Sequence, residues 1–184
     1  MQLIPTEIPA VKILETRKYG DHRGFFSETY SRKALRELGV DLEFVQDNHS
    51  LSAQKGVVRG LHYQVAPTSQ DKLVRVVRGA ILDVAVDIRK SSPTFGKHVS
   101  AVISAANWRQ ILVPIGFAHG FVTLEENTEV IYKVTNYYSP KDERGIRWND
   151  PALGIDWQID PAAAVLSDRD TRHPMLKDAA ELFA

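Results

Sequence analysis

The sequence contains no cysteine, which excludes disulfides, thiol nucleophiles and zinc–thiolate sites. No stretch approaches the roughly 18 apolar residues of a membrane span, and residues 1–7 lack the basic start and apolar core of a signal peptide. Acidic and basic side chains balance at 23 each, so no overall charge attracts nucleic acid or an anionic membrane. We therefore expect a soluble cytoplasmic protein without nucleic-acid or membrane partners. Any anionic ligand must be held by a local cluster of charges.

Phosphate-binding loops of the P-loop or dinucleotide-binding type are also missing. What the chain does contain is a pair of short segments, residues 60–64 and 114–120, each with a histidine beside glycines. Arg59, Lys72 and Tyr132 add two cations and a phenol. Together these residues supply an acid, a base and a positive charge. That combination suits proton transfer on a charged substrate and is poorly suited to redox or thiol chemistry.

Apolar residues recur mainly with the period of two that is typical of β-strands. In residues 80–88 every even position is apolar, whereas Asp83 and Asp87 fall on the opposite face. Helices long enough for βαβ crossovers are missing between the strands, so the pattern favours a sandwich or barrel. Further strands are expected at residues 72–77, 99–103, 110–113, 121–124 and 130–135.

Two helices are predicted. Ser31 can cap a helix over residues 32–38, which ends at Gly39. A second helix is expected over residues 174–183, where a proline opens an apolar stripe. No linker, repeat or low-complexity tract divides the chain, so the sequence predicts one domain over residues 1–184.

His62 lies in a predicted strand, where it shares a face with Gln64 while Arg59 takes the other face. A histidine can act as a base at neutral pH once a carboxylate fixes its tautomer. Tyr132 lies among apolar strand neighbours and can act as a general acid. Both residues also fit ordinary core positions, in which each side chain finds one hydrogen-bond partner. The pattern alone leaves the catalytic and the structural interpretation open.

Four basic residues are candidates for binding an anion: Lys72, Arg59, Arg23 and Arg169. The planar fork of arginine suits phosphate, and lysine supplies a point charge that can stabilise an oxyanion. Taken singly, each is more often a solvated surface charge. Arg59 and Lys72 are preferred because both lie in or beside the strands that flank His62.

A metal site is the alternative to an anion-binding, proton-transfer site. His62 and His119 could be two ligands, but Gln64 stands where a second strand histidine would be wanted. Glu28 and Glu125 are the carboxylates one could invoke, and nothing local supports either. Because three protein ligands are the usual minimum, the sequence does not favour a metal.

The chain resembles the dTDP-4-dehydrorhamnose 3,5-epimerases, the cofactor-free sugar-nucleotide branch of the cupins. The resemblance rests on ordered motifs such as GDHRGFFSE at residues 20–28 and VRGLHYQ at residues 58–64. Similar segments run over almost the whole chain, at residues 44–50, 72–75, 83–89, 92–96, 116–121, 135–140 and 148–150. Any one of these motifs would be weak alone, but their common order makes the resemblance specific.

The resemblance implies an all-β, cupin-type jelly-roll β-barrel with a few short helices, and a homodimer in which an N-terminal strand joins the partner's sheet. It also implies a role for four residues. His62 corresponds to the general base, Asp170 to the carboxylate that orients it, and Tyr132 to the general acid on the other face of the sugar. Lys72 would stabilise the enolate oxygen. Asp168 is the alternative to Asp170, because both aspartates lie in the same short stretch.

No cofactor and no metal are implied, and the ligand would be a dTDP-sugar of the dTDP-L-rhamnose pathway. Arg23 and Glu28 match positions that reach the ligand across the dimer. The other residues expected to line the site are Gln46, Asn48, Arg59, His119, Tyr138, Glu143 and Arg169.

Three alternatives stay open at this point. Relatives that invert only C3 or only C5 share nearly the same motifs, so the product is less firmly implied than the chemistry. A metal-dependent cupin and a non-catalytic sugar-nucleotide-binding cupin are the other two. The joint presence of His62, Tyr132, Lys72 and an acidic partner argues against a pure binding protein.

Overall fold

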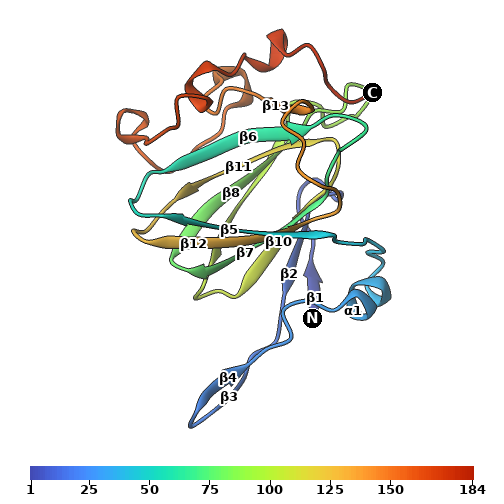
Figure 1. The fold of residues 1–184 in the computed structure, drawn as a ribbon, viewed down its shortest axis with the longest axis vertical. Helices are drawn as coiled ribbons and strands as arrows, with labels where there is room; N and C mark the ends of the chain where they lie inside the picture. Colours follow the sequence, from blue (N-terminus) through green and yellow to red (C-terminus); the bar gives the residue numbers. More distant parts are fainter.

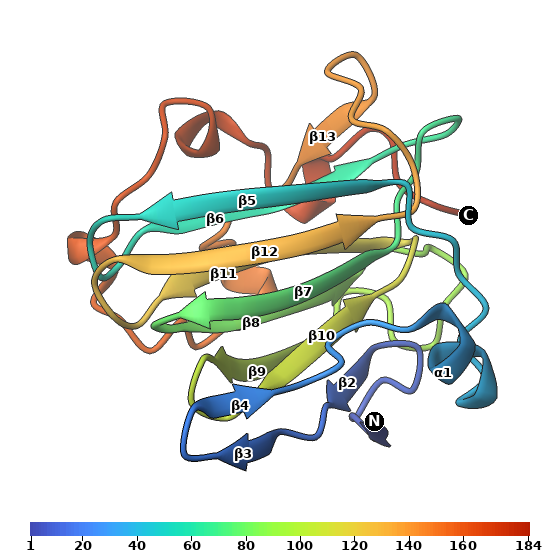
Figure 2. The same cartoon turned by 60° about the horizontal axis from the view of Figure 1, so that its bottom comes forward.

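The computed structural model describes residues 1–184 and consists mainly of antiparallel β-strands. Two sheets lie face to face (Figures 1 and 2). From edge to edge, the first sheet contains β1 (Gln2–Ile4), β2 (Lys12–Glu15), β10 (Arg109–Val113), β7 (Lys72–Arg78), β12 (Thr128–Val134) and β5 (Gln46–Ser52). The second sheet contains β13 (Glu143–Gly145), β6 (Val58–Gln64), β11 (Phe117–Thr123), β8 (Ala80–Asp87) and β9 (His98–Ser104). The all-β prediction is confirmed.

All the strands predicted from alternation are present, within a few residues at each end. The largest difference is β11, which begins at Phe117 and so includes His119. β8 is buried along its whole length, so its two faces meet two different cores. Ile81 and Ala85 belong to the core between the sheets, and Asp83 and Asp87 alternate with them on that inner face.

The outer face of the second sheet is covered by the C-terminal part of the chain, drawn in orange and red over β6 in Figure 1. Leu82, Val84 and Val86 of β8 pack there with Trp148 and Trp157. This segment contains four short 3-10 turns, at Pro151–Leu153, Pro161–Ala163, Asp170–Arg172 (η3) and Leu176–Asp178. Because this segment covers the outer face of the sheet, β8 is buried on both faces.

The predicted helix over residues 32–38 is confirmed as α1 (Arg32–Glu37), with the Ser31 side chain accepting a hydrogen bond from the Ala34 amide. The predicted helix over residues 174–183 is wrong. Its backbone is hydrogen-bonded elsewhere instead, since the amide of Lys90, just after β8, donates to Phe183 O and the hydroxyl of Tyr63 on β6 donates to Glu181 O. None of the helices is long and apolar enough to cross a membrane.

A two-stranded hairpin, β3 (Tyr19–Asp21) and β4 (Gly24–Phe26), projects from the body of the protein (Figure 1). Its aromatic side chains are largely exposed, with 57% of Phe25 and 70% of Phe26 accessible. Phe25 makes an edge-on contact with Trp108 at a centroid distance of 5.0 Å. The hairpin thus presents apolar surface away from its own core.

Candidate active site

A cavity of about 710 Å³ lies between the two sheets, within the size range of ligand sites. Its walls contain every residue predicted for the site except Arg23 and Glu28. The residues brought together are Gln46, Asn48, Arg59, His62, Lys72, His119, Tyr132, Tyr138, Glu143, Arg169 and Asp170. They come from both sheets and from the C-terminal cover.

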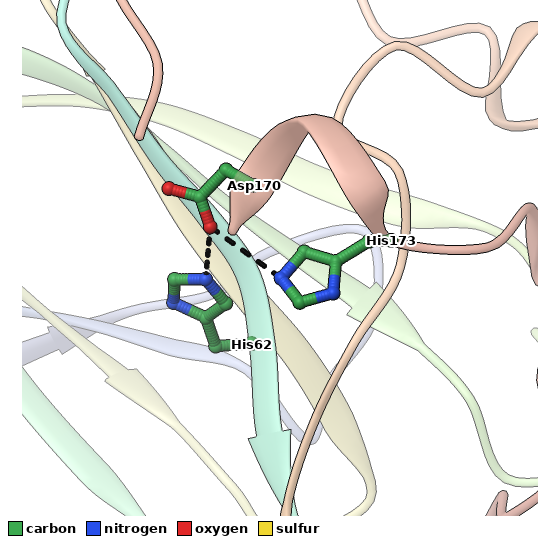
Figure 3. A group of neighbouring side chains, drawn as sticks. All are labelled: His62, Asp170 and His173. Carbon is green, nitrogen blue, oxygen red and sulfur yellow. Dashed lines mark hydrogen bonds and ion pairs between the residues drawn. The ribbon is translucent and has the colours of Figure 1, made fainter. Parts of the chain in front are cut away.

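His62 of β6 contacts Asp170 of η3, 108 positions further along the chain (Figure 3). The distance from His62 Nε2 to Asp170 Oδ1 is 2.5 Å, and Asp170 is 4% exposed. Ser167 Oγ donates to the other Asp170 oxygen at 2.8 Å. Asp168, the alternative partner, is exposed. The geometry therefore pairs His62 with Asp170.

The charge state of this pair follows from its surroundings. Burial alone would raise the pKa of Asp170, but the nearby His173 and the hydrogen bonds with His62 and Ser167 outweigh it and lower that pKa. Burial lowers the pKa of His62, against the opposing pull of Asp170. At neutral pH the pair is therefore an aspartate and a neutral imidazole. Since the carboxylate only accepts, Nε2 holds the proton and Nδ1 is the basic nitrogen.

A β-bulge brings Arg59 to the same wall as His62. Arg59 pairs with Phe121 of β11 and His62 pairs with His119. Between these two pairs β6 advances by three residues and β11 by only two, which is a bulge. Gly60 sits inside this step with a φ of +134°. A Cβ there would lie 2.5 Å from the Cα of Gly120, so the close approach requires glycine. Regular alternation had predicted opposite faces for Arg59 and His62, and that prediction is wrong.

A second histidine–aspartate pair lies deeper in the cavity. His119 Nε2 is 2.9 and 3.0 Å from the two oxygens of Asp83, and both side chains are buried. Lys72 lines the same cavity. Burial lowers the pKa of Lys72 to about 8, while Asp83 and Glu143 act in the opposite direction. Lys72 is therefore mostly an ammonium at pH 7 and suited to stabilise a negative oxygen.

Tyr132 faces the cavity from the first sheet, whereas His62 faces it from the second. Burial raises the pKa of Tyr132, partly offset by Arg59, so the phenol keeps its proton at neutral pH. Both side chains line the same cavity, whose volume of about 710 Å³ has room for a sugar ring. A neutral imidazole and a protonated phenol therefore lie on opposite walls of one cavity.

Polar residues at the mouth are linked to one another. Glu143 Oε2 accepts a hydrogen bond from the hydroxyl of Tyr138 at 2.7 Å and also pairs with Arg169. Gln46 donates to Asn48 Oδ1 at 2.8 Å. Such a rim of amides, a guanidinium and an exposed aromatic ring offers contacts for a phosphate and a base.

Arg23 and Glu28 do not reach this cavity. Both are exposed, on and just after the projecting hairpin, and Arg23 pairs with Asp21. These two residues can therefore contact a ligand only in the cavity of another copy of the chain.

Two polar neighbours of the site were missed by sequence reasoning, Ser167 and His173. Both bond or contact Asp170. His173 follows Asp170 at i+3, a spacing that aligns side chains in a 3-10 turn, but no sequence feature predicted the turn. The ligand atoms of His62, Asp170 and His173 lie within 4.8 Å of one another, the one His/Asp cluster with metal-like spacing. His119, the other candidate ligand in the sequence, is bound to Asp83 instead.

A sequence profile of the dTDP-4-dehydrorhamnose 3,5-epimerase family matches residues 5–178. A Shigella flexneri protein named dTDP-4-dehydrorhamnose 3,5-epimerase is 52% identical over 180 residues, covering 97% of this chain and 98% of that protein.

Solved structures give the same result. The dTDP-6-deoxy-D-glucose-3,5-epimerase of Legionella pneumophila, in complex with dTDP-4-keto-L-rhamnose, has a TM-score of 0.93 at 47% identity, covering 97% of this chain and 94% of that one. A 3'-monoepimerase from Streptomyces bikiniensis, in complex with dTDP-quinovose, has a TM-score of 0.87 at 34% identity, covering 94% and 87%.

The two facing sheets place the chain in the cupin-type jelly-roll class, and its named relatives are isomerases that act on carbohydrates. The chain belongs to the dTDP-4-dehydrorhamnose 3,5-epimerase family. The family and fold expected from the sequence motifs are thus confirmed.

Proposed function

We propose that this protein inverts C3 and C5 of dTDP-4-dehydro-6-deoxy-D-glucose, giving dTDP-4-dehydro-L-rhamnose. Membership of the epimerase family supports the substrate class. The observation that argues most directly for the chemistry is the opposition of His62 and Tyr132 across one cavity. Inversion at carbon requires a proton to leave one face and another to arrive on the opposite face.

Proton removal falls to His62. The C4 ketone acidifies the hydrogens on C3 and C5, because the resulting carbanion delocalises onto O4. Neutral His62 accepts the proton at Nδ1, and Asp170 at 2.5 Å stabilises the imidazolium that forms. No electrons are exchanged in this reaction, so the proposal includes no redox cofactor.

Lys72 and Tyr132 complete the reaction. The Lys72 ammonium meets the negative charge that develops on O4, an electrostatic contribution that is often the largest in such reactions. Tyr132, protonated at neutral pH, returns a proton from the other wall. After each inversion the imidazolium loses its proton to solvent and the phenolate regains one, so the same groups serve both carbons if the ring turns between the two inversions.

The remaining polar residues would hold the nucleotide. Arg59 and Arg169 are suited to the diphosphate, because a guanidinium can bind phosphate in a bidentate manner. Tyr138, half exposed at the mouth, is suited to stack on the base. Binding energy from this remote part positions the reacting carbon against His62. Gln46, Asn48, His119 and Glu143 would supply the other polar contacts.

A homodimer is part of the proposal, with Arg23 and Glu28 entering the partner's cavity. The exposed hairpin supports it, because these two residues lie outside their own cavity. Co-expressed Arg23→Ala and His62→Ala chains test it. A mixed dimer would contain one intact site, so a 1:1 mixture should recover about a quarter of wild-type activity. If Arg23 acts within its own chain, the mixture stays inactive.

Proton NMR of dTDP-4-dehydro-6-deoxy-D-glucose in D2O tests the reaction itself. Deuterium at both C3 and C5, with the L-sugar product trapped by a reductase, is the expected result. Deuterium at one carbon only would identify a mono-epimerase, which is the second candidate because the chain is also 34% identical to the Streptomyces bikiniensis 3'-monoepimerase. Binding of dTDP without exchange would identify a binding protein.

Exchange that disappears after chelation and returns with added metal would identify a metal-dependent cupin. We expect exchange to survive chelation, because His62 already uses Nε2 to hold Asp170. The cytoplasmic location expected from the sequence stays a prediction, which cell fractionation tests.

A further inference from the structure

His173 is a second histidine on the carboxylate that orients His62. Its Nε2 atom lies 3.4 Å from Asp170 Oδ1, the same oxygen that His62 contacts at 2.5 Å (Figure 3). At 3.4 Å the contact is longer than an ordinary hydrogen bond. However, this Nε2 is buried and has no other polar partner. Asp170 is the only acidic side chain within 4 Å of this nitrogen.

Packing fixes the ring of His173 in this place. A Cβ on Gly145 would lie 2.4 Å from His173 Cε1, so the ring rests directly on the backbone of β13. Gly145 is itself paired with His62 in the β-ladder. The two imidazole rings meet edge to face, with centroids 5.4 Å apart and an interplanar angle of 74°. A glycine, two histidines and one aspartate thus form a compact unit.

This arrangement distributes the charge of Asp170. One carboxylate oxygen faces two imidazoles, and the other accepts from Ser167 Oγ. The contact from His173 is one of the causes that lower the pKa of Asp170. A carboxylate that is partly neutralised by a second donor attracts the His62 imidazolium less strongly. Lys72 and Arg169 are the other charged groups that act on His62, and both lower its pKa.

We propose that His173 is a positioning residue, which holds Asp170 in the orientation that His62 needs and limits how basic His62 becomes. The inference rests on the proposed proton abstraction by His62. It adds a residue that makes no contact with the substrate and that does not line the cavity. His173 acts through Asp170 alone.

Two variants test the proposal. His173→Phe keeps the ring against Gly145 but removes the donor, whereas His173→Gln keeps a donor at a similar reach. In the Phe variant we expect kcat for deuterium exchange to fall about tenfold, because Asp170 loses a polar contact that helps to hold its orientation. We also expect the acid limb of kcat/KM to move to higher pH, because the unshared carboxylate raises the pKa of His62. The Gln variant should lie closer to wild type in both respects, with dTDP affinity unchanged in each.

An acid limb at the wild-type position in His173→Phe, or equal losses in the two variants, would overturn the proposal. If neither variant folds, 15N NMR of histidine-labelled wild type decides, because His173 can donate only if its Nε2 is protonated. An unprotonated Nε2 rejects the role. The same NMR titration reports the His62 pKa without turnover. If the wild-type enzyme catalyses no deuterium exchange, the proposed function is wrong. The role of His173 can still be tested by this titration, because the titration does not depend on turnover.

Discussion

Replacing Asp170 with asparagine removes one negative charge from a site that is 4% exposed. In the proposed mechanism the carboxylate stabilises the imidazolium formed when His62 takes a proton. With charge centres about 4 Å apart and an effective dielectric constant near 20, that stabilisation is about 4 kcal/mol. Each 1.36 kcal/mol is a factor of ten in rate, so exchange should slow about 10³-fold. The asparagine amide can also donate to Nε2, which would move the imidazole proton to Nδ1 and remove the base.

The assay is the initial rate of deuterium incorporation at C3 and C5, measured by NMR with saturating substrate. Asp168→Asn is the matched control, because it makes the same chemical change two residues away at an exposed position. The control should exchange at the wild-type rate, and both variants should bind dTDP as wild type does. Exchange by Asp170→Asn within tenfold of wild type would refute the reasoning. It would mean that His62 needs no charged partner.

Three further outcomes are expected. Tyr132→Phe should slow the formation of inverted product more than it slows deuterium incorporation at the substrate carbon, because the variant lacks only the group that returns a proton from the other wall. Equal losses of both would show that Tyr132 has a structural role. Gly120→Ala should destabilise the fold by roughly 1–3 kcal/mol, because its Cβ would lie 2.8 Å from Arg59 O. A thermal melt should show this as a lower Tm, with Gly20→Ala, where the nearest atom is 3.6 Å away, as control. The pH profile of kcat/KM should be bell-shaped. Its acid limb should fall below pH 6.5, because burial lowers the pKa of His62, and its basic limb should fall near pH 8, as Lys72 loses its proton. A profile that is flat from pH 5 to pH 9 contradicts both assignments.

Local periodicity predicted the strands well because each strand of this fold alternates between two environments. Periodicity did not show that both faces of β8 are buried in the protein interior. Asp83 alternates with the apolar residues Leu82 and Val84, as a solvent-facing aspartate would, yet it lies inside and is bonded to His119. A buried aspartate and an exposed one have the same spacing in sequence, and only the partner distinguishes them.

Other features depend on contacts that alternation cannot express. The bulge at Gly60 needs Gly120 on the neighbouring strand, so the common orientation of Arg59 and His62 is a property of two strands together. Asp170 lies 108 residues from His62, and family motifs, not spacing, pointed to it. The prediction of a C-terminal helix was wrong for a related reason, since that backbone is hydrogen-bonded to residues far away in the sequence, such as Lys90.

The opposition of the two sheets has a consequence for how such enzymes diversify. On the proposed roles, protons always depart toward the sheet that contains β6 and always arrive from the sheet that contains β12. The direction of proton flow is therefore built into the barrel and is the same for every carbon that is presented. Whether one stereocentre or two are inverted then depends on how freely the sugar can rotate between the walls. Side chains that restrict this rotation could convert a double epimerase into a single one without any change to its acid or base.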